Sequence, residues 1–294
     1  MRRPLGDWAR NQLLFECSPS QLCGSNRDAL LDALSFHPPL FLTVWAAQMV
    51  AYHGIGLWFQ RFDHTGRLAR FKTRPVEARP YLEILPRAVG NQVFLLLPAM
   101  GLAQWLGLAF SGPTHISPLM WIVSLAGMSV GHDLVQYVFH RYVMHRPELM
   151  NRLGHAVHHS TTASCSISAC YMSAADFVAE IVCPYLIPLV VVGGGGADPA
   201  FHIFAVTMGA FGGLYEHSGY DFSLGLAQST SPLARKIAPL LSSRAHAEHH
   251  ARGNVSFSDG FGSSSLCDTF LRTRWDLVKA KLRQRETRAT ENAT

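Results

Sequence analysis

The chain has 294 residues, of which 48% are hydrophobic and only 15% are charged. An average soluble chain carries about 25% charged residues, so this composition disfavours an ordinary soluble domain and favours a membrane protein with polar parts outside the bilayer. The formal net charge of +5 is not gathered into a basic run interleaved with aromatic residues, which disfavours a nucleic-acid-binding protein.

Residues 1–37 are mixed and polar, and they lack the apolar core of a secretory signal peptide. We therefore expect the first membrane segment to direct insertion. Cys17 and Cys23 lie close enough for a disulfide in an oxidising compartment, but two free thiols are the favoured interpretation. None of the six cysteines forms a Cys-x-x-Cys pair, which disfavours structural zinc and thioredoxin-like chemistry.

Three long apolar runs predict membrane-spanning helices. The run 38–58 contains no Asp, Glu, Lys or Arg and is long enough to cross a bilayer. A polar, basic loop over 60–87 separates it from a second run over 88–110, and a short turn leads to a third run over 119–139. We therefore expect three spans before the first histidine-rich segment.

Two shorter apolar runs follow over 178–192 and 201–215, and four glycines at 193–196 separate them. Both runs are short for a full span, and Pro184 and Pro188 are expected to kink the first. We interpret the pair as a helical hairpin that either spans or re-enters the membrane. The glycines are expected to form its turn.

Nine histidines in the second half of the chain form three clusters and one isolated position. They are His140 and His145 in HRYVMH, His155, His158 and His159 in HAVHH, His217 in EHSG, and His246, His249 and His250 in HAEHH. Positions i, i+3 and i+4 of a helix share one face, so each His-x-x-His-His cluster is expected to point three imidazoles at one spot. Neutral imidazole suits iron, zinc, copper and nickel, and nine exceed the three or four ligands of a usual zinc site. The pattern therefore predicts two metal ions with shared surroundings.

His140 and His145 are five residues apart, a spacing that places them about 140° apart on a regular helix. The helix is therefore expected to end or distort before His145, in keeping with Pro147 two residues later. Arg141 is expected to pair with a carboxylate or a lipid phosphate, or to extend its side chain to the membrane surface.

The distribution of basic residues predicts which side of the membrane the histidines occupy. The loop 60–87 has the strongest basic excess and is therefore expected to be cytoplasmic. If each apolar run crosses the membrane, the third run returns to the cytoplasm at His140, and the hairpin returns there at His217. Basic residues around the last cluster keep it on the same side. All nine histidines are thus expected at one cytoplasmic face.

The order of these motifs resembles the histidine boxes of the fatty acid hydroxylase/sterol desaturase superfamily, which includes the sterol C4-methyl oxidases. Asp133 and Tyr137, upstream of the first box, are similar to the family's Asp-x-x-x-Tyr-x-x-His-Arg pattern. The resemblance covers roughly 119–273. Two segments depart from the family pattern: Val-Ser follows Asn254 in place of an Asn-Tyr-Gly-like turn, and Leu-Arg-Thr273 stands in place of Phe-Gly-Thr.

The resemblance implies a non-haem di-iron centre that uses O2 to oxidise a C–H bond of a lipid-like substrate, such as a sterol, fatty acyl chain, sphingoid base or terpenoid. It implies that the nine histidines bind the two iron ions and carry the catalysis. No haem, flavin or dinucleotide motif occurs, so electrons are expected from NAD(P)H through a separate carrier, such as cytochrome b5 or ferredoxin with its reductase. The expected membrane is the endoplasmic reticulum in a eukaryote or the inner membrane in a bacterium.

Metal-bound histidines usually donate their remote ring N–H to another group of the protein. Asp133, Glu216, Asp221 and Glu248 are the sequence's candidates for accepting these hydrogen bonds. His132, two turns before the first box, is expected to support the site indirectly or to pack as a buried polar group.

A desaturase that uses the same centre is the closest alternative, because both reactions remove hydrogen and differ in whether oxygen is added. A zinc intramembrane protease is disfavoured because no His-Glu-x-x-His occurs. A metal transporter would place its ligands at the bilayer midplane, whereas these lie beyond the apolar runs. A non-catalytic membrane scaffold is a further alternative.

The sequence therefore predicts an all-α, multi-pass transmembrane helical bundle with a cytoplasmic histidine-rich helical cap. Its expected parts are a polar segment over 1–37, two transmembrane helices and a basic loop over 38–116, a di-iron domain over 117–273, and a basic tail over 274–294.

Overall fold

The computed structural model describes residues 38–75, 79–258 and 263–278. Within these ranges the protein is built of helices without a β-strand, and one isolated bridge pairs Lys72 with Tyr220. The prediction of an all-α fold is confirmed. The polar segment 1–37, with Cys17 and Cys23, lies outside the described residues, as does most of the predicted basic tail.

The helices follow one another along the chain with short connections. The longer ones are α2 (Leu40–Thr65), α3 (Tyr81–Asn91), α4 (Leu97–Trp105), α5 (Pro118–Phe139), α9 (Cys183–Val192) and α10 (Pro199–His217). The shorter ones are α6 (Pro147–Met150), α7 (His155–His159), α8 (Ala174–Phe177), α11 (Ser223–Ala227), α12 (Pro232–Ile237), α13 (Arg244–Arg252) and α14 (Leu266–Phe270). Three π-helical segments are η2 (Gln92–Leu96), η3 (His140–Met144) and η5 (Val178–Val182), and three 3-10 turns are η1 (Ala69–Phe71), η4 (Ser166–Cys170) and η6 (Ala238–Leu241).

Three helical stretches are long and apolar enough to cross a membrane: Leu40–Thr65, Pro118–Met144 and Ala174–Val192. They contain the predicted first and third spans and the first arm of the predicted hairpin. The predicted second span is helical, as α3, η2 and α4 in succession, and the second arm forms α10, but neither is among the three.

The outer faces of these stretches carry large apolar side chains that no other part of the described chain covers. Val50, Ile122 and Val191, one on each stretch, are 76%, 66% and 78% exposed. Apolar surface of this kind is unfavourable in water and suits contact with lipid. Composition, helix length and surface therefore agree on a membrane protein.

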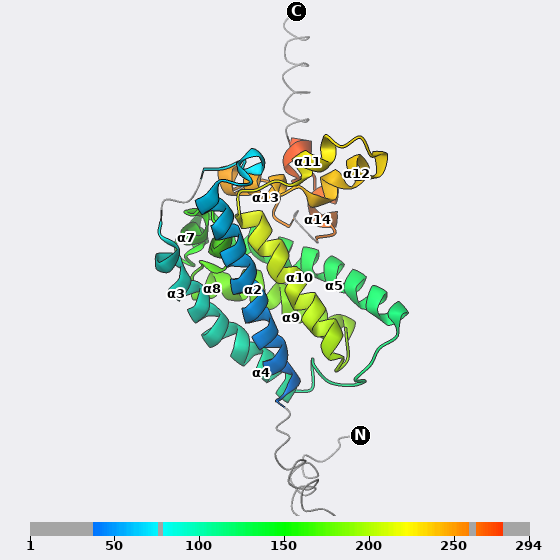
Figure 1. The fold of residues 1–294 in the computed structure, drawn as a ribbon. Helices are drawn as coiled ribbons and strands as arrows, with labels where there is room; N and C mark the ends of the chain where they lie inside the picture. Colours follow the sequence, from blue (N-terminus) through cyan, green and yellow to red (C-terminus); the bar gives the residue numbers. More distant parts are fainter. Residues whose placement is uncertain (1–37, 76–78, 259–262, 279–294) are drawn as a thin grey trace, which may run out of the picture. The chain divides into compact units, whose positions relative to one another are not determined.

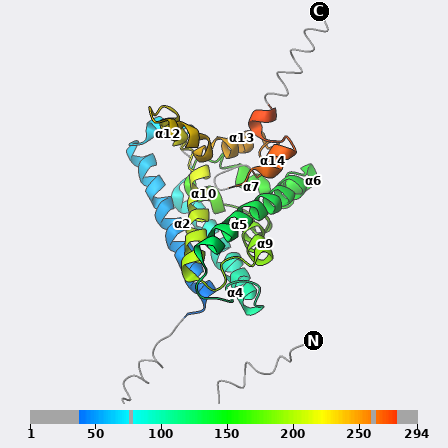
Figure 2. The ribbon, with the colours of Figure 1, turned by 90° about the vertical axis from the view of Figure 1, so that its right-hand side faces the viewer.

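The predicted hairpin forms, but its two arms diverge. Gly193 and Gly195 adopt left-handed backbone angles and turn the chain after α9. From there α9 packs on α5, whereas α10 packs on α2 (Figures 1 and 2). A Cβ atom added to Gly131 of α5 would lie 2.7 Å from the Cβ of Pro188, so the small residue allows α5 and α9 to approach closely.

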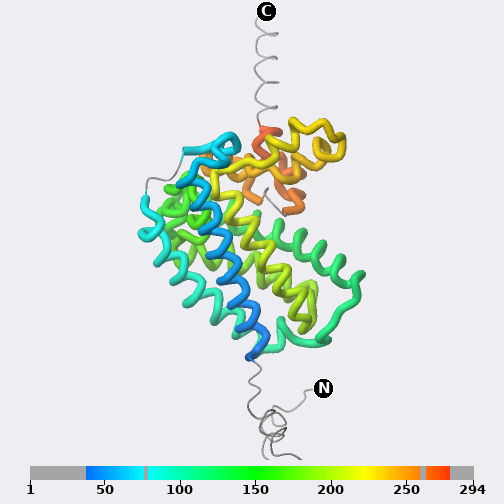
Figure 3. Tube along the Cα trace, viewed as in Figure 1, coloured from blue at the N-terminus to red at the C-terminus, as the bar shows by residue number. Residues whose placement is uncertain are grey.

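A buried aromatic layer joins the end of α2 to the segment that follows α10. Phe59 stacks on Tyr215 and Tyr220, with ring centroids 6.5 and 5.9 Å apart. The short helices α11 to α14 gather at this end of the long helices (Figure 1), and Figure 3 shows the chain running from α10 into them. Since His140 directly follows α5 and α10 ends at His217, the fold brings the histidine-rich segments to one end of the bundle.

Candidate metal centre

The structure brings all nine predicted histidines together. Five ring nitrogens, from His140, His145, His155, His159 and His249, lie within 4.8 Å of one another, and four more, from His158, His217, His246 and His250, form a second group within the same limit. The rings of His159 and His250 stack with their centroids 4.5 Å apart, so the two groups adjoin. We call them the group of five and the group of four.

The two His-x-x-His-His helices divide their histidines between the groups. On α7, His155 and His159 belong to the group of five while His158 belongs to the group of four. On α13 the division is reversed, since only His249 joins the group of five. The expectation of three imidazoles at one spot is therefore wrong. Positions i and i+4 differ by about 40° around a helix, but i+3 and i+4 differ by about 100°, so each helix serves both groups.

The first box delivers both of its histidines to the group of five through the π-helical segment η3. The N–H of His145 donates to the carbonyl of His140 at 2.9 Å, an i to i+5 bond that widens the turn. The two Nε2 atoms then lie 3.2 Å apart. The predicted distortion before His145 is confirmed, and it takes the form of a widened turn.

Hydrogen bonds on the far side of the rings fix which nitrogen faces each group. Nδ1 donates to a backbone carbonyl in three rings: His140 to Phe257 at 2.7 Å, His249 to Val255 at 2.7 Å, and His217 to Gly213 at 2.8 Å. Because the proton is on Nδ1, the Nε2 atom of each ring carries only a lone pair.

These Nε2 atoms face one another at short range. In the group of five, Nε2 of His145 lies 3.2, 3.0 and 3.1 Å from Nε2 of His140, His155 and His249, and in the group of four, Nε2 of His217 lies 3.1 and 3.0 Å from Nε2 of His158 and His246. Nε2 of His140, His155, His217 and His249 offers a lone pair because Nδ1 of each ring donates elsewhere, and the other rings offer one when their proton is on Nδ1. Nitrogens about 2.1 Å from one metal ion would be about 3.0–3.4 Å apart in octahedral or tetrahedral geometry. The donor type and its spacing therefore fit one metal ion in each group.

Burial keeps several of these imidazoles uncharged. Burial and the neighbouring imidazoles hold the pKa of His246, His249 and His250 well below the usual value. Burial and the nearby His155 likewise lower the pKa of His159 to about 3. The neutral form is the one that binds metal ions, so these four imidazoles are in their binding form at neutral pH.

Two buried carboxylates that the sequence analysis missed lie beside the group of five. Asp176 accepts a hydrogen bond from Nδ1 of His155 at 2.9 Å, and Oε1 of Glu180 lies 3.4 Å from the same nitrogen. Burial by itself lowers the pKa of His155, but the charge of Glu180 and the bond to Asp176 outweigh it and raise the pKa. The available signal was a pair of acidic residues four apart at the start of an apolar run, where ionisable side chains usually serve function.

Comparison with protein families identifies the chain. A family model described as "Fatty acid hydroxylase" matches residues 125–273, which is about half of the chain and includes all nine histidines. The chain belongs to the fatty acid hydroxylase family. Neither the curated proteins nor the solved structures contained a match. The family is one of oxidoreductases that act on lipids, and its histidine boxes supply both groups described above.

The fatty acid hydroxylase pattern upstream of the first box holds the end of the matched region in place. Asp133 accepts hydrogen bonds from the hydroxyl of Ser258 and from the backbone N–H of Leu266, the latter at 2.7 Å. The hydroxyls of Tyr137 and Thr273 lie 3.2 Å apart. The segment held in this way carries the carbonyls that orient His140 and His249, so the two departures from the family pattern leave this orienting role intact.

The carboxylates that we expected to accept the ring N–H groups have other roles. Asp133 binds the segment just described, and Asp221 accepts hydrogen bonds from the hydroxyls of Ser223 and Ser242. Glu248 forms ion pairs with Arg244 and Arg252 on its own helix. Glu216 is half-buried. His132 is exposed on α5. A residue adjacent to a helical histidine points about 100° away from it. The observed acceptors are instead the carbonyls of Val255, Phe257 and Gly213 and the carboxylate of Asp176.

The basic loop after α2 supports the histidine segments from behind. Nζ of Lys72 lies 2.6 Å from Asp63 and donates to the carbonyls of Ser164 and Ser218 at 3.1 and 2.8 Å. These carbonyls belong to the segments that follow the second box and His217. Part of the loop's positive charge is thus used inside the protein.

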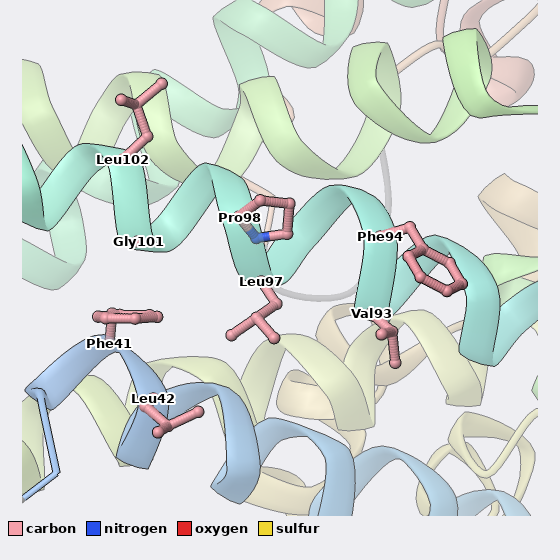
Figure 4. A pocket seen from close by; sticks show the side chains of 8 residues that line it. All are labelled: Phe41, Leu42, Val93, Phe94, Leu97, Pro98, Gly101 and Leu102. Atoms are coloured by element: carbon pink, nitrogen blue, oxygen red, sulfur yellow. The ribbon is translucent and has the colours of Figure 1, made fainter.

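An apolar groove of about 500 Å³ lies away from the histidines (Figure 4). It is lined by Phe41, Leu42, Val93, Phe94, Leu97, Pro98, Gly101 and Leu102. It lies between the first turn of α2 and the helix formed by η2 and α4, whereas the histidine-bearing helices α7 and α13 lie toward the other end of α2 (Figure 1). The groove is therefore separate from the candidate metal centre.

Proposed function

We propose that this fatty acid hydroxylase family member is an O2-dependent di-iron hydroxylase that oxidises a C–H bond of a lipid-like substrate. The observation that carries the proposal is the pair of adjoining histidine groups, each spaced for one metal ion. Unactivated C–H bonds resist acid–base chemistry, and a bound pair of iron ions would supply the oxidising power together with O2.

The chain's own residues hold the imidazoles in position and keep water away from them. His155 and His249 are fully buried, and each has its far nitrogen engaged by a fixed acceptor. A dry, preformed site limits the side reactions of an oxidising centre. A lipid-like substrate is the natural choice, because His140 lies near the end of a helical stretch with an apolar, exposed outer face.

In this proposal the histidine end of the helices faces the cytoplasm. Arg61, Arg67 and Arg70 are exposed around the end of α2, in keeping with the positive-inside rule. Such a surface suits an acidic electron carrier, either cytochrome b5 or ferredoxin with its reductase, that delivers electrons from NAD(P)H. The membrane is the endoplasmic reticulum in a eukaryote or the inner membrane in a bacterium.

The test is oxidation of membrane lipids under ¹⁸O2 by cells that express the wild type or His249→Ala. We expect a lipid product that carries one ¹⁸O atom in the wild type, and at least about tenfold less product and less bound iron in the variant. His64→Ala is the matched control, because His64 is exposed on α2 outside both groups.

A product that has lost two hydrogens and gained no ¹⁸O would replace hydroxylation by desaturation at the same centre. If neither bound iron nor any oxidised lipid depends on His249, the proposed function is wrong.

A further inference from the structure

The chain makes an excursion between two histidines of the group of four. His217 ends α10 and His246 lies on α13, and between them residues 223–241 form α11, α12 and η6. We call residues 223–241 the arm. Figure 1 shows α12 at the edge of the short helices that gather at the histidine end of the molecule. Neither histidine group takes a member from the arm, so the candidate metal centre does not explain its features.

Both ends of the arm are held against the end of α10. The hydroxyl of Tyr215 donates to the carbonyl of Leu241 at 2.6 Å and accepts from the N–H of Phe222 at 2.9 Å. The hydroxyl of Ser243 donates to the carbonyl of Tyr220 at 2.7 Å. The arm is thus a loop closed at its base, and the surface that it presents has a defined place on the protein.

One face of the helix formed by α12 and η6 is apolar and exposed. Leu233, Ile237 and Leu240 are spaced i, i+4 and i+7, so they lie on the same face. Leu233 and Leu240 are 68% and 74% exposed. Ala238, about 140° from Leu233 around the helix, is buried and faces the protein instead. The described residues leave the three large side chains exposed, and we call them the apolar stripe.

The charge of the arm is entirely positive. Arg235 and Lys236 are its only charged residues, since it contains no Asp or Glu. Lys236 is exposed and lies about 60° from Leu233 around the helix, beside the apolar stripe. Arg235 lies on the far side and donates to the carbonyls of Ser229 and Thr230 at 2.8 and 3.1 Å. An exposed apolar stripe flanked by a basic residue is typical of a helix that lies in the headgroup region of a membrane.

The place of the arm in the fold favours the same partner. The stretch Pro118–Met144 ends within the first histidine box, so the histidine groups lie where an apolar stretch leaves the membrane. Tyr215 and Tyr220, which hold the base of the arm, flank His217 in the sequence. The arm therefore starts at the level of the lipid headgroups, where contact with lipid would cover its apolar stripe.

We propose that the arm rests on the membrane surface, with its apolar stripe among the acyl chains next to the headgroups and Lys236 against anionic phospholipid. The inference goes beyond the proposed function, because it requires no metal ion and gives the protein a membrane contact besides its spanning helices. Apolar area and one basic residue each contribute to binding of this kind.

The test replaces Leu233, Leu240 or Thr230, one at a time, by the photocrosslinking residue p-benzoylphenylalanine in the full chain. The purified proteins are reconstituted into vesicles of phosphatidylcholine and phosphatidylglycerol, irradiated and analysed by mass spectrometry. Thr230 is the matched control, because it is exposed on the arm but precedes the helix that carries the apolar stripe. The mass of each adduct shows whether the partner is a phospholipid or a second copy of the chain.

We expect at least about tenfold more phospholipid adduct from positions 233 and 240 than from position 230. With the crosslinker at position 240, Lys236→Gln should lower the ratio of phosphatidylglycerol to phosphatidylcholine adducts by about fivefold, the contribution of one basic residue near an anionic surface. Arg61→Gln removes an exposed charge at the end of α2 and should leave this ratio unchanged.

Equal yields of phospholipid adduct from positions 230 and 240 would overturn the inference. So would crosslinks from the apolar stripe that go mainly to a second copy of the chain, because they would make the stripe a surface for self-association. An unchanged adduct ratio in Lys236→Gln would overturn the role assigned to the lysine. The proposed function would stand in each case, since none of these results depends on bound iron.

Discussion

Single hydrogen bonds decide which nitrogen four of the nine imidazoles turn toward their group. In His140, His217 and His249 a backbone carbonyl accepts a hydrogen bond from Nδ1, and in His155 a carboxylate accepts it. A carbonyl fixes the tautomer without adding charge, whereas Asp176 also makes its histidine a stronger ligand. Replacing the Asp176 side chain should therefore change metal affinity without altering the backbone, unlike any change to the carbonyl contacts.

Replacing Asp176 by asparagine tests this role. The variant keeps the size of the side chain but loses its charge, so we expect iron to bind the group of five about 10–100-fold more weakly. Competition for iron with a chelator of known affinity measures the change. Equal chelator midpoints for Asp176→Asn and wild type would show that this bond does not support metal binding.

Lys72 is a second residue whose contacts lie behind the site. Lys72→Met removes the cation from a nearly buried pair with Asp63 and leaves two carbonyls without their donor. We expect the free energy of unfolding to fall by about 3 kcal/mol, at the low end for a broken buried pair, because Tyr220 still donates to Asp63. Thermal unfolding in detergent measures the loss.

Arg67→Met is the control for this substitution, because Arg67 belongs to the same loop region and is exposed. It should change stability by no more than about 0.5 kcal/mol. Similar losses in both variants would assign the effect to general loss of positive charge rather than to the contacts of Lys72.

Among the helical elements, the π-helical turns place ligands that a regular helix would separate. In η3 the widened turn aligns His140 with His145, and in η5 it accompanies the approach of Glu180 to the group of five. Such turns are rare and often accompany functional sites. A π-helical turn destabilises the helix, so its presence here is consistent with selection for the ligand geometry that it produces.

At the scale of the whole molecule, the fold brings together histidines from four segments spread over residues 140–250. Apolar runs and histidine spacing were sufficient to predict the all-α class, two of the three expected spans, the first arm of the hairpin and the nine histidines that the fold brings together. The division into groups of five and four was not predictable, because it depends on how α7 and α13 sit between neighbours rather than on spacing within each helix.

The contacts that orient the histidines could not be predicted from the sequence either. The carbonyls of Val255 and Phe257 orient two histidines, but every residue has a backbone carbonyl, so the sequence does not indicate which ones do so. Carboxylates next to the boxes were the natural candidates, yet Glu248 points away from the site because it neighbours His249 on a helix. Asp176 and Glu180 were visible as an acidic pair in an apolar run, and only the packing of α8 and η5 beside α7 reveals their target.

The most direct test of the metal centre is a structure of the iron-loaded protein with anomalous diffraction recorded at the iron absorption edge. The two histidine groups predict two anomalous peaks per chain, one enclosed by the group of five and one by the group of four. A single peak shared by the groups, or no iron within them, would contradict the proposed di-iron centre.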